Sequence, residues 1–219
     1  MKLGISIMVA LSLTIATLTG FIINDHIGSI VPTSPIVVVD QQQHVGPKRV
    51  ALAYSLPADL SSKQKQLLVE AYNIAKADGL SDPKLLQAII LRETRAGGMQ
   101  KYSVAGQELG LKTNLRYYGV SQLKLAAARD VLAKWPRLFS QFGFQTQTDE
   151  EVIAKLIADD LFNLHIASKY LLLLRNQGFR SNSELALAYN QGAGGARLQD
   201  HNDSPYARAV VQYISKLGV

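Results

Sequence analysis

The sequence predicts a mainly α-helical domain that follows an N-terminal apolar segment. Apolar residues recur at the spacing of a helix from Ser61 onward, and helix-capping patterns stand at the start of several of these stretches. Convincing β-hairpins, and strands in regular alternation with helices, are not evident. The 219 residues suit one ordinary domain with a targeting or anchoring segment, and no internal repeat is found.

Residues 3–23 form an uncharged apolar run that Lys2 precedes. The run is long enough to span a bilayer as a helix. We expect an uncleaved signal anchor over residues 1–23, because a cleavable signal usually has a shorter apolar centre and an A-x-A-like site. A cleaved signal peptide and a buried core helix are the alternatives. Lys2 on the cytoplasmic side predicts that the chain after Asn24 lies in the periplasm, anchored at the inner membrane.

Residues 24–56 predict an extended tether, because they are rich in proline and polar residues and hold one short apolar stretch. Residues 57–219 are expected to form the domain. Asp82 should cap one of its helices, with Pro83 at the first helical position, and Thr148 should cap another. The predicted helices run from Ser61 to Asp78, from Asp82 to about Arg95, from Leu125 to Lys134, from Thr148 to Gly178, from Ser183 to Tyr189 and from Pro205 to Leu217.

The charge balance and the absence of cysteine exclude several function classes. Lys and Arg outnumber Asp and Glu by 23 to 17, which favours anionic partners such as membrane surfaces or acidic polymers. The basic residues are scattered without interleaved aromatics, so no nucleic-acid partner is expected. Without cysteine, disulfides, thiolate metal sites and a cysteine nucleophile are excluded. The histidines lack metal-ligand spacing and the glycine clusters lack a phosphate-binding motif, so neither a metal nor a cofactor is expected.

Glu93 lies on the apolar face of its predicted helix. At about 100° per residue it shares that face with Leu86, Ile89 and Ile90, and no cation stands three or four residues away. Desolvation, together with the helix dipole in the last turn, raises the pKa of a carboxyl group in such a place. A raised pKa is what a general acid at neutral pH requires. The structural alternative is a Glu that pairs with a distant Arg or is exposed because the helix ends early.

Five short motifs follow one another in the chain after Pro83. They are LRET with Glu93 and Thr94, YGVSQLKLAAARDV with Gly119, Gln122 and Ala127, DDLFNLHIASKYLL with Asp159, Asn163, Tyr170 and Leu171, AYNQGAG with Ala188, Tyr189, Asn190 and Gly192, and PYARAVV with Pro205, Tyr206 and Val210. In this order they resemble the catalytic domain of the soluble-type lytic transglycosylases, a lysozyme-like family that cleaves the glycan strands of peptidoglycan. The resemblance covers about 130 residues and implies a lysozyme-like transglycosylase domain.

Several of these motifs depart from the pattern of the family. Thr94 replaces the serine that follows the acid in the family, Ser121 replaces an apolar residue, and Lys124 stands where a methionine is often found. The chain between the first two motifs is also longer than is usual in the family. These departures concern substrate preference more than the chemistry. Within the third motif, Asn163 is expected to tie down loops, as buried polar groups on such a helix more often do.

The resemblance implies a role for each matched polar residue of the site. Glu93 is the general acid and base, and Tyr189 orients Glu93 and the departing sugar by hydrogen bonding. Gln122 binds sugar through its amide, and Asn190 contacts substrate or holds the turn. Thr94 contacts Glu93 or substrate, or ends the helix through its hydroxyl. The structural alternatives are a core tyrosine for Tyr189 and a solvated helix start for Gln122.

The implied reaction is non-hydrolytic cleavage of the β-1,4 bond between N-acetylmuramic acid and N-acetylglucosamine, which leaves 1,6-anhydro-muramic ends. A hydrolytic muramidase is the nearest alternative, and Glu108 and Asp130 are its nearby candidates for a second carboxylate. A non-catalytic peptidoglycan-binding module of an envelope assembly is the alternative from another class. The expected partners are peptidoglycan glycan strands and the inner membrane, and the chain could serve wall turnover, a secretion or conjugation channel, or a phage.

Overall fold

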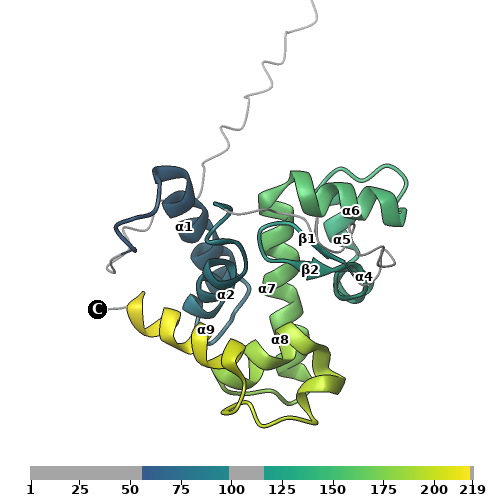
Figure 1. The fold of residues 1–219 in the computed structure, drawn as a ribbon. Coiled ribbons are helices and arrows are strands. Elements are labelled where there is room, and N and C mark those ends of the chain that lie inside the picture. Colours follow the sequence, from purple (N-terminus) through teal and green to yellow (C-terminus); the bar gives the residue numbers. More distant parts are fainter. Residues whose placement is uncertain (1–55, 99–115, 218–219) are drawn as a thin grey trace, which may run out of the picture. The chain divides into compact units, whose positions relative to one another are not determined.

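The computed structural model describes residues 56–98 and 116–217 (Figure 1). The predicted anchor over residues 1–23 lies outside this part of the chain, as do almost all of the predicted tether over residues 24–56 and the candidate carboxylate Glu108. Of the described helices, none combines the length and the hydrophobicity that crossing a bilayer requires. The described residues are mainly helical, which confirms the predicted fold class at that level.

The helices are, in chain order, α1 (Ser62–Ala77), α2 (Lys84–Thr94), α4 (Leu125–Lys134), α5 (Arg137–Gln141), α6 (Asp149–Ala158), α7 (Asp160–Asn176), α8 (Asn182–Ala196) and α9 (Pro205–Lys216). Between α2 and α4, strands β1 (Tyr117–Tyr118) and β2 (Leu123–Lys124) form a small antiparallel sheet. In its register Tyr117 pairs with Lys124 and Tyr118 pairs with Leu123.

Helix α2 lies in the core of the domain. Its residues from Leu85 to Leu91 are all buried, including Gln87, whose Nε2 donates to the carbonyl of Leu68 at 2.8 Å. It packs against α1 and α9, as Figure 1 shows, and α9 also packs against α8. A helix that is buried on every side requires an almost continuous apolar sequence, and that accounts for the run that leads to Glu93. Each fully buried Leu or Ile side chain contributes roughly 1.5–3 kcal/mol to folding.

The predicted helix cap at Thr148 is confirmed, whereas at α2 the N-cap residue is Pro83 and Asp82 bonds to the helix start from one position earlier. Oδ1 of Asp82 accepts a hydrogen bond of 3.0 Å from the backbone N–H of Lys84, at the start of α2. The hydroxyl of Thr148 accepts one of 3.3 Å from the N–H of Glu151, at the start of α6. In each case a side-chain oxygen satisfies a backbone donor that has no partner within the helix.

The sequence shows no convincing β-hairpin, but the structure contains a short one, β1–β2. The β1–β2 hairpin escapes sequence patterns because each strand has only two residues, too few for an alternation of apolar and polar residues. Its turn depends on backbone conformation: Gly119 (φ +75°) and Gln122 (φ +50°) are both left-handed. A left-handed residue other than glycine is uncommon, so surrounding contacts must hold Gln122 in place.

The single helix predicted from Thr148 to Gly178 is in fact the two helices α6 and α7. They are separated by Asp159, whose backbone is extended (φ −113°, ψ 97°). The carboxylate of Asp159 accepts a hydrogen bond of 3.0 Å from the N–H of Phe162 and so caps α7. Asp competes for backbone donors in this way, which favours a helix start over a helix interior.

Two further helices differ from the sequence expectation. Helix α8 continues beyond Tyr189 to Ala196, with a bend at Gly192 (φ 79°, ψ 160°), a conformation that glycine adopts readily. The short helix α5 follows Pro136 and was not expected, because five residues are too few to show a helical period.

The expectation that Asn163 ties down a loop is confirmed. This residue of α7 is fully buried, and its Oδ1 accepts hydrogen bonds from the N–H (2.9 Å) and the hydroxyl (2.5 Å) of Ser121. Its Nδ2 donates to the carbonyls of Tyr118 (3.1 Å) and Leu156 (3.2 Å). The β1–β2 turn passes so close that a Cβ at Gly119 would overlap the Asn163 amide. One amide side chain therefore fixes the hairpin against α6 and α7.

Candidate active site

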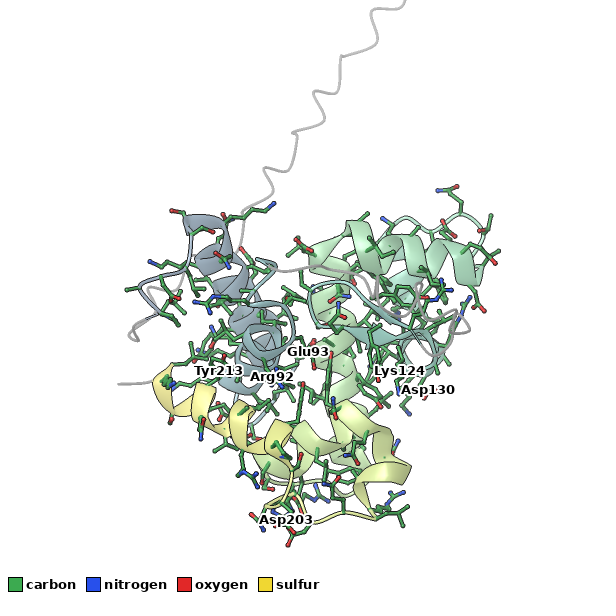
Figure 2. All side chains as sticks on the ribbon, in the orientation of Figure 1. Arg92, Glu93, Lys124, Asp130, Asp203 and Tyr213 are labelled. Atoms are coloured by element: carbon green, nitrogen blue, oxygen red, sulfur yellow. The ribbon has the colours of Figure 1, made fainter. Side chains whose placement is uncertain are left out.

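Glu93 is the second-last residue of α2, and its side chain is half-buried. The residues that precede it on the same helix face, Leu86, Ile89 and Ile90, are fully buried. In the view of Figure 2, Arg92 lies on one side of Glu93, and Lys124 and Asp130 lie on the other. Within the part of the chain that the structure describes, Glu93 makes no ion pair. The carboxyl group of Glu93 therefore lies at the edge of the core, where α2 ends.

The C-terminal end of α2 is held by an unusual backbone turn. Arg95 (φ 50°), Ala96 (φ 54°) and Gly97 (φ 78°) are all left-handed. The hydroxyl of Thr94 donates to the carbonyl of Val120 at 2.7 Å and accepts from the N–H of Gly97 at 3.0 Å. A left-handed residue other than glycine costs about 1–2 kcal/mol, so these contacts are needed to keep the turn. They fix the backbone directly after Glu93 to the β1–β2 hairpin.

Thr94 itself differs from the sequence expectation of a substrate contact. Its side chain is fully buried, and its hydroxyl is occupied by Val120 and Gly97. With no accessible surface, Thr94 does not present its hydroxyl to a sugar in this structure, and its assignment to substrate binding stays a prediction. The alternative, that its hydroxyl ends the helix, agrees with the contacts.

Tyr206, in the first turn of α9, makes the direct contact with the carboxyl group of Glu93. Its hydroxyl donates a hydrogen bond of 2.5 Å to Oε1 of Glu93. The guanidinium carbon of Arg92 lies 5.6 Å from the centre of the Tyr206 ring, within the range of a cation–π contact. Burial raises the pKa of the Tyr206 hydroxyl well above its usual value, and the charge of Glu93 adds to this effect. Tyr206 is therefore a neutral donor at any physiological pH.

Desolvation raises the pKa of Glu93 above the usual value. The hydrogen bond from Tyr206 and the positive charge of Arg92 both lower it, and burial outweighs them. The hydrogen bond occupies Oε1, which leaves Oε2 as the oxygen that can carry the acidic proton. A carboxyl group with a raised pKa and one free oxygen can donate a proton and take one back.

Tyr189 lies on α8 and is 8% exposed. Its hydroxyl donates to the carbonyl of Ser121 at 2.9 Å, and its ring meets the Tyr170 ring edge to face at 5.7 Å between centres. Burial raises the pKa of Tyr189 well above its usual value, and the charge of Glu93 also contributes. The hydrogen bond to Glu93 that the resemblance implied for Tyr189 is thus made by Tyr206, and Tyr189 holds the turn before Gln122.

A cavity of about 280 Å³ lies between the β1–β2 hairpin with α4 on one side and α7 with α8 on the other. Gln122, Tyr189 and Asn190 all line it, so three of the residues expected to bind substrate share one cavity. Gln122 donates through Nε2 to the carbonyl of Gly119 at 2.9 Å, which leaves its amide oxygen for a ligand. Asn190 makes no side-chain hydrogen bond in the described part of the chain. Glu93 does not line this cavity.

Tyr206 is the residue whose contact with Glu93 the sequence did not indicate. The matched segment PYARAVV contains it, but nothing in that segment points to a carboxyl group 113 positions away. Ser121 is the other unexpected contributor, because its backbone accepts from Tyr189 while its side chain donates to Asn163. Both contacts depend on how the helices pack.

Among the residues that the structure describes, no group of three or more His, Asp and Glu side chains could hold a metal ion. Comparison of the chain with protein-family models, with curated proteins and with solved structures found no match. The fold and the site by themselves define a mainly α-helical domain in which Glu93 is half-buried, makes no ion pair with the described residues and accepts a hydrogen bond from Tyr206. The site also includes a cavity that is lined by several polar side chains, Tyr189 among them.

Proposed function

We propose that this chain is a peptidoglycan lytic transglycosylase with a lysozyme-like catalytic domain, and that Glu93 is its general acid and base. The observation that carries the proposal is the state of Glu93: a half-buried carboxyl group with a raised pKa, without an ion pair, and held through one oxygen by a neutral tyrosine. The ordered motifs that resemble this family add to it. Such a carboxyl group is costly to bury, and proton transfer is a function that would retain it.

In the first step, Glu93 gives its proton from Oε2 to the oxygen of the β-1,4 bond that leaves with N-acetylglucosamine. The bond from C1 of N-acetylmuramic acid to that oxygen breaks, and positive charge develops at C1. The N-acetyl group of the substrate can stabilise this charge, so a second protein carboxylate is not required. Tyr206 retains its hydrogen bond to Oε1 and stabilises the carboxylate that forms.

In the second step, the ionised Glu93 takes the proton from the C6 hydroxyl of the same muramic residue. The C6 oxygen then forms the new bond to C1, which gives the 1,6-anhydro ring. The nucleophile is already part of the substrate, so no water has to be positioned. Glu93 ends the cycle protonated, with no net gain or loss of protons.

The remaining site residues would position the substrate. Gln122 and Asn190 offer amide groups to sugar hydroxyl and N-acetyl groups along the cavity wall. Tyr189 keeps the backbone of Ser121 in place and thereby the turn that presents Gln122. No metal or cofactor has a part in this mechanism. The proposal includes a periplasmic location, anchored through residues 3–23, because peptidoglycan lies outside the inner membrane.

The test is mass analysis of the muropeptides that the full chain, in detergent, releases from purified sacculi. The expected products end in 1,6-anhydro-muramic acid and are lighter by one water than products with a reducing end. Glu93→Gln should release nothing, because an amide of nearly the same size cannot exchange a proton. Intact sacculi that bind the protein tightly would instead indicate a non-catalytic binding module.

A hydrolytic muramidase is a second candidate, because Asp130 supplies a carboxylate to the wall of the cavity. Such an enzyme would use a second carboxylate to activate water on the opposite face of the sugar. Products that carry only reducing ends would support this candidate, and Asp130→Asn should then abolish their release.

A further inference from the structure

The cavity beside Tyr189 has charged groups that an uncharged sugar does not need. Its wall contains Lys124 on the hairpin side and Asp130 on α4. Figure 2 shows these two side chains near each other, on the same side of Glu93. Peptidoglycan sugars are neutral once the muramic lactyl group is linked to its peptide. A cation and an anion in one cavity wall therefore suggest a ligand group other than the sugar ring.

Lys124 is held in place by the register of the hairpin. The residue pairs across the sheet with Tyr117, and its ammonium lies 5.1 Å from the centre of the Tyr117 ring. The side chain is half-buried, and in the described part of the chain its ammonium has no carboxylate partner. A positioned ammonium without a counter-ion can donate hydrogen bonds to a carboxylate group of a ligand.

Asp130 faces the cavity because of its position on α4. Ala126 and Ala127, four and three residues earlier, also line the cavity, so one face of the helix forms this wall. Their small side chains leave the space, and Asp130 adds a charge to it. Asp130 makes no ion pair and no side-chain hydrogen bond with the described residues. Its carboxylate is therefore free to accept hydrogen bonds from an ammonium group of a ligand.

We infer that the part of the cavity wall formed by Lys124 and Asp130 binds the peptide stem of the glycan strand, with Lys124 contacting a stem carboxylate and Asp130 contacting a stem ammonium group. The inference rests on the proposed function and names the part of the substrate that the cavity recognises. A peptide that carries both kinds of charged group matches a wall that offers one unpaired partner for each. The enzyme accordingly prefers stem-bearing strands to strands whose stems have been removed.

The test compares two substrates made from the same glycan strands, one with stems intact and one whose stems an amidase has removed. The measured quantity is the ratio of kcat/KM for stem-bearing strands to kcat/KM for bare strands. In the wild type this ratio should be about tenfold or more, and Lys124→Met or Asp130→Asn should each lower it about five- to tenfold. Lys134→Met is the matched control, since Lys134 is on the same helix, is exposed and does not line the cavity.

A second measurement separates this inference from the proposed function. Glu93→Gln is titrated with a soluble disaccharide that carries a stem and with the same disaccharide without one. Glu93→Gln should bind the stem-bearing form more tightly. This difference should disappear when Lys124→Met or Asp130→Asn is added to Glu93→Gln. Such a result supports the stem site whatever the cleavage chemistry. Equal cleavage and equal binding of both forms would overturn the inference while anhydro products still upheld the transglycosylase. If neither strand is cleaved, the proposed function fails. The ratio of the affinities for the two disaccharides then shows whether the cavity binds a peptide stem.

Discussion

The hydroxyl of Tyr206 donates a hydrogen bond of 2.5 Å to Oε1 of Glu93, and the two residues stand 113 positions apart in the chain. The contact joins the last turn of α2 to the first turn of α9, two helices that pack directly against each other. A residue remote in sequence thus adjusts the proton affinity of the carboxyl group, because a donor to the ionised form lowers its pKa.

For Tyr206→Phe we expect the alkaline limb of the pH profile of kcat/KM to move to higher pH. The hydrogen bond from Tyr206 lowers the pKa of Glu93, so its removal raises that pKa and keeps the general acid protonated further into the alkaline range. Tyr213→Phe is the control on the same helix, because the Tyr213 hydroxyl makes no hydrogen bond in the described structure. A profile of Tyr206→Phe that coincides with wild type would contradict the role of this contact.

For Glu93→Gln we expect a gain in stability that increases with pH. Burial raises the pKa of Glu93 above the usual 4.5, so the folded state holds this proton more tightly than the unfolded state. The resulting stabilisation is fully present below pH 4.5 and is lost as pH rises through the folded-state pKa. The glutamine does not titrate. Thermal unfolding at pH 4 and at pH 7.5 should therefore show a Tm difference, variant minus wild type, that is larger at pH 7.5.

For Tyr189→Phe we expect a loss of about 1 kcal/mol in the free energy of unfolding, together with reduced activity. The ring still fills its place, but the buried carbonyl of Ser121 loses its donor and the turn before Gln122 loses a support. In a protein of this size the change corresponds to a Tm lower by about 2–4 °C. Tyr170→Phe is the control, because the Tyr170 hydroxyl makes no hydrogen bond in the described residues. Normal Tm with low activity would point to a direct contact of Tyr189 with substrate.

For Gly119→Ala we expect roughly 2–5 kcal/mol of destabilisation, or failure to fold. The new Cβ would overlap the Asn163 amide and the Leu156 carbonyl, and the residue would also remain left-handed. Gly143→Ala separates the two effects, because Gly143 is left-handed as well but has no neighbour that a Cβ would meet. The control should lose only about 1–2 kcal/mol in chemical denaturation. Equal losses in the two variants would mean that the overlap has no effect.

For Glu151→Gln we expect a lower Tm at neutral pH that returns to the wild-type value in acid. The carboxylate accepts backbone hydrogen bonds from Gln145 (2.7 Å), Thr146 (2.8 Å) and Gln147 (2.7 Å), which lower its pKa to about 2. Stability from a lowered pKa is present above the unfolded value and is lost as pH falls through the folded one. The two proteins should therefore converge as pH falls from 4.5 to about 2. Glu150→Gln, at an exposed neighbouring position, should show no such convergence.

Local patterns in the sequence predicted much of the helical framework. The cap at Thr148, the hydrogen bond of Asp82 at the start of α2 and the buried face of α2 all agree with the structure, because each depends on residues within one or two turns of a helix. The position of Glu93 at the end of that face also follows from the helical period. The break at Asp159 was missed, because an apolar period on both sides concealed a capping residue.

The sequence by itself determined that the domain is mainly helical and that Glu93 ends an apolar helix with no cation one turn away. Only the tertiary structure decided which hydroxyl binds that carboxyl group, that Thr94 is buried, and that Gln122, Tyr189 and Asn190 line one cavity. The reason is the range of the forces concerned. Helix period and caps act between residues three or four positions apart, whereas the pairing of Glu93 with Tyr206 requires α2 and α9 to pack across the core.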